Sequence, residues 1–256
     1  MVTRNQMEGK RMNGTLRQIL LMTDGHSNYG EDPVAIARLA QEYDVTVNVI
    51  GITDENRENE KGLQEVEAIA LAGGGVSEIV FARQLAKTVQ MVTRKAMTQT
   101  LHGVVNQELK QILGQNDEME DLPPEKRGQV MEVVDDLGEK VLLEVLVLID
   151  TSASMTNKLP MVQEALLDLS ISLNSRSGDT KFSLYSFPGK RKPIERLLDW
   201  TPKLQSLTAT FTKLSTAGMT PTGPALQAAL QVFEERRGKR RLEDDENEQR
   251  QGRFGF

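Results

Sequence analysis

The sequence has no cysteine, one tryptophan and only two histidines, His26 and His102. Without cysteine the chain can form no disulfide, no thiolate nucleophile and no cysteine-ligated zinc site, and it suits a reducing compartment. Two histidines supply little material for triad chemistry. The net charge of −6 also argues against a broad nucleic-acid surface, because contact with phosphates needs a basic face.

Long apolar runs are missing as well. No run reaches the ~18 residues that a membrane-spanning helix requires, and residues 1–11 are polar and lack the apolar core of a signal peptide. We therefore expect a cytoplasmic protein without a membrane span. The 256 residues, of which 38% are apolar, can bury a full core as one large α/β domain or two small ones.

Apolar, strand-like segments alternate with helical patterns along the chain. This alternation predicts a doubly wound α/β fold, with a mostly parallel six-stranded sheet and helices on both faces. The expected strands are residues 18–22, 45–52, 79–81, 141–149, 182–187 and 194–200, and the expected helices are residues 33–40, 62–71, 85–113, 160–173, 204–214 and 224–236. A further short strand at residues 130–134 is expected to pair with residues 141–149 across a turn.

Three segments have the composition of loops or tails. Residues 1–16 are interpreted as a flexible leader, residues 114–128 as an acidic, proline-containing linker, and residues 238–256 as a charged flexible tail. The glycine run at residues 73–75 follows a helical pattern and is interpreted as a helix stop rather than a dinucleotide loop. We find no internal repeat, which argues against two copies of a small domain.

A carboxylate and two hydroxyl groups follow the most apolar of the strands. Residues 145–149 run into Asp150-Thr151-Ser152-Ala153-Ser154, so Asp150, Ser152 and Ser154 stand at alternate positions just beyond a buried strand. Open α/β sheets bind ligands at the carboxyl edge of their strands. Oxygen groups at this spacing suit a hard cation such as Mg²⁺ or Mn²⁺.

This segment resembles the DxSxS motif of von Willebrand factor A and integrin I domains. Their metal-ion-dependent adhesion site (MIDAS) also uses a Thr and a second Asp from two other loops. Ala217-Gly218-Met219-Thr220-Pro221-Thr222-Gly223 resembles the Thr loop, and Leu20-Leu21-Met22-Thr23-Asp24-Gly25 resembles the strand and turn that end in the second Asp. The resemblance therefore implies a metal site built from Asp150, Ser152, Ser154, Thr220 and Asp24.

The order of these segments is reversed. In the family the Asp loop follows the Thr loop, whereas here Asp24 precedes Asp150. Residues 17–113 look like the C-terminal half of the domain and residues 129–237 like its N-terminal half, which indicates a circular permutation with its cut at the sheet end opposite the metal. The permuted order is similar to that of the small YabS-type proteins of spore-forming firmicutes, and it implies a role in sporulation.

The resemblance also implies a chemistry for the site. In the family the two Ser residues bind Mg²⁺ directly, the Thr binds it directly or through water, and the two Asp residues hold its waters. Because only two carboxylates serve the cation, it stays electrophilic and can accept an Asp or Glu from a partner. We therefore expect a non-enzymatic, magnesium-dependent protein-binding module, monomeric rather than an obligate oligomer, with no nucleic-acid partner.

Several alternatives stay open at this stage. An enzyme could use the same site for metal-dependent hydrolysis or phosphotransfer, although we can name no general base or substrate pocket. A haloacid-dehalogenase-type phosphatase needs a second Asp where Ser152 stands. The fold could also have lost the metal and serve as a scaffold, or the two halves could complete each other between chains. His26, close to Asp24, could contribute a ligand, but a loop histidine is more commonly solvated.

Overall fold

The computed structural model describes residues 15–53, 60–113, 122–202, 210–211, 214, 216 and 218–252. Its strands are β1 (Thr15–Thr23), β2 (Val45–Thr53), β3 (Gly74–Phe81), β4 (Leu142–Asp150), β5 (Thr180–Phe187) and β6 (Glu195–Thr201). They form one six-stranded sheet in the order β3-β2-β1-β4-β5-β6. Neighbouring strands pair in parallel except β5 and β6, which are antiparallel. The mostly parallel, six-stranded α/β sheet predicted from the sequence is confirmed.

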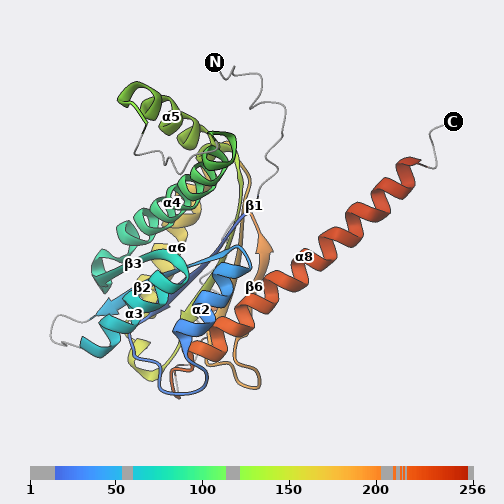
Figure 1. The fold of residues 1–256 in the computed structure, drawn as a ribbon. Helices are drawn as coiled ribbons and strands as arrows, with labels where there is room; N and C mark the ends of the chain where they lie inside the picture. Colours follow the sequence, from blue (N-terminus) through green and yellow to red (C-terminus); the bar gives the residue numbers. More distant parts are fainter. Residues whose placement is uncertain are drawn as a thin grey trace.

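Helices cover both faces of this sheet (Figure 1). Helices α2 (Pro33–Glu42), α3 (Glu60–Ala72) and α8 (Thr222–Gly252) contribute to one apolar core, and α4 (Leu85–Leu113) and α6 (Leu159–Asn174) contribute to the other. Strand β1 serves both cores, because Ile19 and Leu21 face one and Leu20 and Met22 face the other. This arrangement explains the unbroken apolar runs, since central parallel strands are buried on both faces.

One expected strand is a helix. Residues 130–134 do not pair with β4 but lie within α5 (Pro124–Lys140), which packs on α4. Pro124 stands at the start of this helix, where its fixed φ angle is favourable and its missing N–H costs nothing. Val130, Val134 and Leu137 all contact the core, at spacings of four and three residues that belong to a helix and not to a strand. Residues 124–128 of the expected linker (residues 114–128) therefore belong to helix α5.

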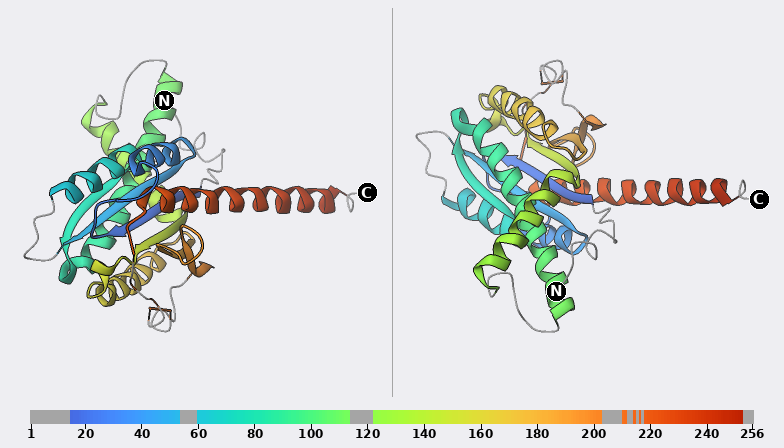
Figure 2. Two further views of the ribbon diagram at one scale, coloured as in Figure 1. Left: turned by 90° about the horizontal axis from the view of Figure 1, so that it is seen from below. Right: turned by 90° about the horizontal axis from the view of Figure 1, so that it is seen from above.

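The bounds of other elements differ from those predicted. Helix α8 continues to Gly252, so the tail expected to be flexible is helical up to that residue and projects beyond the sheet (Figure 2). Strand β3 is longer than expected and begins at Gly74, whose φ of +64° suits glycine. Most of the helix expected at residues 204–214 and of the leader lies outside the described residues. Within the described ranges no helix is long and apolar enough to cross a membrane.

The end of the second half meets the beginning of the first half at the amino end of the central strands. Arg236, from α8, donates a 2.7 Å hydrogen bond to the buried carboxylate of Glu144 on β4, and Arg17 of β1 lies 3.5 Å from the same carboxylate. The next residue, Arg237, donates to the carbonyl of Tyr43 just before β2. At Arg236, α8 thus lies beside the beginning of β1, which is where the family fold would connect them.

Candidate metal centre

The centre lies where the order of the sheet reverses. Strands β1 and β4 are neighbours in the sheet. The chain continues from β1 to β2 on one side of this pair and from β4 to β5 on the other side. Their register aligns Met22 with Ile149, so Thr23 and Asp150 emerge together at the carboxyl edge. Such a switch point forms a crevice in open α/β sheets, and ligands bind there.

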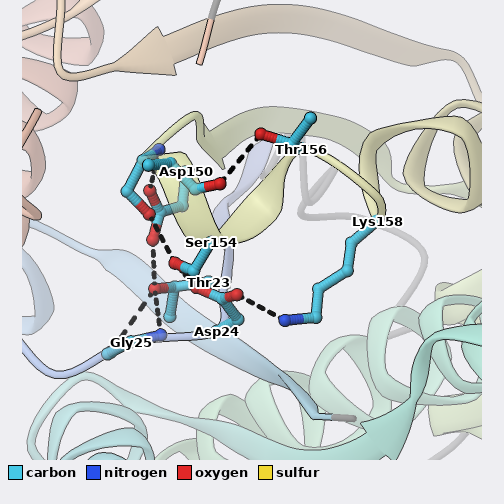
Figure 3. A network of polar contacts seen from close by, with 9 residues as sticks. Thr23, Asp24, Gly25, Asp150, Ser154, Thr156 and Lys158 are labelled. Atoms are coloured by element: carbon cyan, nitrogen blue, oxygen red, sulfur yellow. Dashed lines mark hydrogen bonds and ion pairs between the residues drawn. The ribbon is translucent and has the colours of Figure 1, made fainter. Parts of the chain in front are cut away.

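Asp150, whose polar contacts are drawn in Figure 3, is fully buried at this edge of the sheet. Its carboxylate accepts a 2.7 Å hydrogen bond from the Thr23 hydroxyl and another of 2.7 Å from the backbone N–H of Ser152. Burial, with a smaller contribution from the nearby Asp24, raises the pKa of Asp150 to about 6 against the lowering effect of these hydrogen bonds. A buried carboxylate with such a pKa is a group that a cation would stabilise in its charged form.

The two serines and Asp24 converge beside Asp150. A short 3-10 turn, η3 (Ala153–Met155), brings the hydroxyls of Ser152 and Ser154 to within 3.2 Å of each other. Ser154 Oγ donates a 2.8 Å hydrogen bond to Asp24 Oδ1, although 130 positions separate the two residues. The structure therefore brings together, in one chain, the residues that the sequence assigned to two different halves.

Thr220 lies on the same edge and is held there by the loop after β1. Its backbone N–H donates to the Asn28 side chain at 2.9 Å, and the Asn28 N–H donates to the Thr220 carbonyl at 3.2 Å. The Thr220 hydroxyl faces Gly25, where a Cβ atom would approach it to 3.5 Å. The Thr loop is thus fixed directly to the loop that carries Asp24.

The donor set fits a hard divalent cation. All five side chains present oxygen atoms, three as hydroxyls and two as carboxylates, and hydroxyl and carboxylate oxygens are the ligands that Mg²⁺ and Mn²⁺ accept. No group of three or more His, Cys, Asp or Glu residues suited to a metal occurs in the described part of the chain. A serine-rich site with two carboxylates does not require such a group.

Two residues at the centre were not predicted. Thr23 supplies the hydroxyl that holds Asp150, and its position at the end of β1 in register with β4 could have indicated it. Lys158 is the second. Its ammonium group lies 2.5 Å from Asp24 Oδ2, and the side chain is only 5% exposed. The signal for Lys158 was a lysine at the start of a helix, a position that disfavours positive charge.

His26 lies in the loop that follows Asp24. Its Nδ1 forms an ion pair with Glu65, whose other carboxylate oxygen accepts a 2.8 Å hydrogen bond from the Ser27 N–H. The His26 side chain is about half exposed. The histidine thus fixes the loop after Asp24 to α3, whereas the sequence favoured a solvated loop histidine.

The reversing sheet, the DxSxS loop at its carboxyl edge and the second Asp are features of an α/β domain of the von Willebrand factor type A class. Family models described as von Willebrand factor type A domain match residues 2–95 and residues 145–251. The chain belongs to this family, with its two halves in permuted order.

Two relatives extend the likeness over nearly the whole chain. The chain is 65% identical over 235 residues to "Uncharacterized protein YabS" of Bacillus subtilis (strain 168), covering 91% of this chain and 96% of that protein. A crystal structure of an uncharacterized protein from Alicyclobacillus acidocaldarius subsp. acidocaldarius DSM 446 superimposes with a TM-score of 0.81 at 42% identity, covering 88% of this chain and 96% of that one. The YabS-type resemblance inferred from the sequence is confirmed.

Proposed function

We propose that the chain is a non-catalytic protein-binding module whose partner offers an Asp or Glu to a divalent cation held by Asp150, Ser152, Ser154, Thr220 and Asp24. The observation that carries the proposal is the 2.8 Å hydrogen bond between Ser154 and Asp24, which joins the two halves of the ligand set at the switch point. Ser152 and Ser154 would hold the cation directly, Thr220 directly or through water, and the two Asp residues through water. The bound cation would supply Lewis acidity toward a partner carboxylate.

Binding is favoured over catalysis by the state of the titratable groups. At this edge of the described structure, Asp150 is buried and hydrogen-bonded, Asp24 is paired with Lys158, and His26 is paired with Glu65. A general base must be able to reach a substrate proton, and each of these groups is already engaged. The proposal includes a cytoplasmic monomer that acts in spore formation, which rests on composition and on the likeness to YabS-type proteins.

Two measurements test this function. Calorimetric titration with Mn²⁺ should show one site in the wild-type chain and none in the double variant Ser152→Ala/Ser154→Ala. A random-peptide selection on immobilised protein, carried out with Mn²⁺ and eluted with EDTA, should then enrich peptides that share an acidic residue. Replacing that residue by its amide should abolish binding, because a neutral amide is a weak ligand for a hard cation.

Two results would argue against this function. Metal titration curves that are the same for the wild type and the double variant would show that the serines hold no cation. Peptides that bind equally well in EDTA would show that any binding surface works without metal. Either outcome contradicts the proposal.

A further inference from the structure

Lys158 occupies a position that ordinary helix chemistry disfavours. It is the N-cap residue of α6, where its side chain makes no capping hydrogen bond. Ser, Thr, Asp or Asn is preferred at this position, and the positive end of the helix dipole repels a cation there. The residue is also buried, at 4% exposure, and buried lysine requires a partner. Conflicts of this kind between a residue and its local environment concentrate at functional sites.

A contact that offsets these costs is made with a residue of the candidate metal centre. Lys158 Nζ lies 2.5 Å from Asp24 Oδ2, while Asp24 Oδ1 accepts the hydrogen bond from Ser154. The Asp24 side chain is 1% exposed, so water screens this ion pair weakly. The ammonium group therefore provides at Asp24 part of the positive charge that a cation would provide.

We propose that Lys158 is a tethered cation that determines the metal affinity of the centre. The inference rests on the proposed function, because it concerns the same five ligands. Asp24 and Asp150 bring two negative charges to the centre, and Lys158 leaves only one of them uncompensated. A divalent cation is consequently attracted less strongly, and it has to compete with the ammonium group for Asp24.

The lysine also changes what the loaded centre attracts. Two carboxylates and a divalent cation alone would sum to zero, whereas the same groups with Lys158 carry one net positive charge. A partner carboxylate brings that sum to zero. Lys158 thus lowers the affinity for the metal by itself and favours an anionic ligand once the metal is present.

Calorimetric titration of the full chain with Mn²⁺ tests the inference. Lys158→Met keeps the length of the side chain without its charge, and Lys158→Gln keeps a hydrogen-bond donor for Asp24 if the first variant folds poorly. Both should bind Mn²⁺ at least about tenfold more tightly than the wild type, because a like charge close to the ion has been removed. Lys140→Met is the matched control, since Lys140 is 64% exposed and pairs with Asp136 on α5. Its affinity should equal that of the wild type.

An increase in affinity distinguishes this role from a structural one, because damage to the fold would weaken binding. Equal or weaker affinity in both Lys158 variants, with clear binding by the wild type, would overturn the inference and leave the proposed function standing. Binding by the variants but not by the wild type would support the inference and contradict metal-dependent binding by the native chain. Absence of binding in all chains would overturn both.

Discussion

Asp150 lies in surroundings that oppose its charge, and this has a consequence for the metal-free protein. Burial holds the pKa of Asp150 at about 6, well above its ordinary value of 3.8. A raised carboxyl pKa means that the folded state favours the neutral form. The stabilising contribution of the neutral form is therefore complete below about pH 4 and is lost as the pH rises through about 6. Above that pH the metal-free fold carries an uncompensated buried charge.

We predict that Asp150→Asn abolishes Mn²⁺ binding and stabilises the metal-free protein at pH 8. At pH 4 the neutral wild-type side chain and the amide should be nearly equivalent, and the advantage of the variant should grow to at most about 3 kcal/mol above pH 6. Urea unfolding in EDTA at several pH values measures this difference. Asp199→Asn is the control, because the Asp199 side chain is 66% exposed. A stability difference that does not depend on pH would show that Asp150 does not titrate as described.

The start of α8 approaches the loop after β1 closely. Gly223, at the start of α8, faces the carbonyl oxygen of Glu31, and a Cβ atom at this position would lie only 1.8 Å from that oxygen. Glu31 belongs to the loop that carries Asn28, which holds Thr220 by two hydrogen bonds. The absence of a side chain at residue 223 therefore allows the two loops of the centre to meet.

We predict that Gly223→Ala destabilises the fold by about 2 kcal/mol and weakens Mn²⁺ binding, because the Glu31 backbone must move away from α8. Gly238→Ala in the same helix is the matched control. A Cβ atom there meets nothing within 4 Å, so this variant should gain about 1 kcal/mol from helix propensity and keep its metal affinity. Thermal and urea unfolding, with calorimetry for the metal, give both quantities. Equal behaviour of the two variants would contradict the close approach.

The attachment of α8 to the sheet centres on Arg236. Its guanidinium group lies 4.5 Å from the ring centre of Trp200 and donates to Glu144, whose side chain is 1% exposed. Removing Arg236 takes away the closer of two arginines at this buried carboxylate and leaves Arg17 at 3.5 Å. Its neighbour Arg237 pairs with the exposed carboxylate of Asp44, and such surface pairs contribute little.

We predict that Arg236→Gln lowers the free energy of unfolding by about 3 kcal/mol, whereas Arg237→Gln lowers it by less than about 1 kcal/mol. The two variants differ by one position and remove the same group, so the comparison isolates burial. Urea unfolding at neutral pH is the measurement. If the two losses were equal, the Glu144 pair would not anchor the helix.

The elements differ in how far the sequence could determine them. The central strands were predictable because burial on both faces produces unbroken apolar runs, and the DxSxS loop was predictable because it follows such a run. The strand predicted at residues 130–134 was wrong because a short β-branched segment fits both a strand and one face of a helix. Lys158 could not be predicted as a partner of Asp24, since no local pattern records that residues 134 positions apart will be buried together.

At the scale of the whole molecule, the candidate centre combines residues from both halves of the chain. Strand β1 pairs with β4 along almost its full length, and Thr23 and Ser154 each contact a residue of the opposite half. The alternative in which halves complete each other between chains would place Asp24 and Asp150 of one site on two chains. The described structure closes the sheet within a single chain.

We predict that variants Asp24→Ala and Asp150→Ala do not complement each other. The two proteins are mixed in urea, refolded together and titrated with Mn²⁺, and no site should reappear, because every closed chain lacks one ligand. If halves were exchanged between chains, random pairing would restore about a quarter of the wild-type sites. Light scattering of the refolded mixture provides the control for the oligomeric state.

The reversed order of the halves also has a consequence for folding during synthesis on the ribosome. Strand β1 is made first, but the edge that it presents to β4 stays unpaired until about a hundred and twenty further residues have been synthesised. An open edge in the middle of a future sheet invites wrong pairing, and contacts between distant residues form slowly. Ordinary domains of this family make the Asp of the DxSxS loop early and add the second Asp strand late. Here the full set of candidate ligands exists only once Thr220, the last of the five in the chain, has been synthesised.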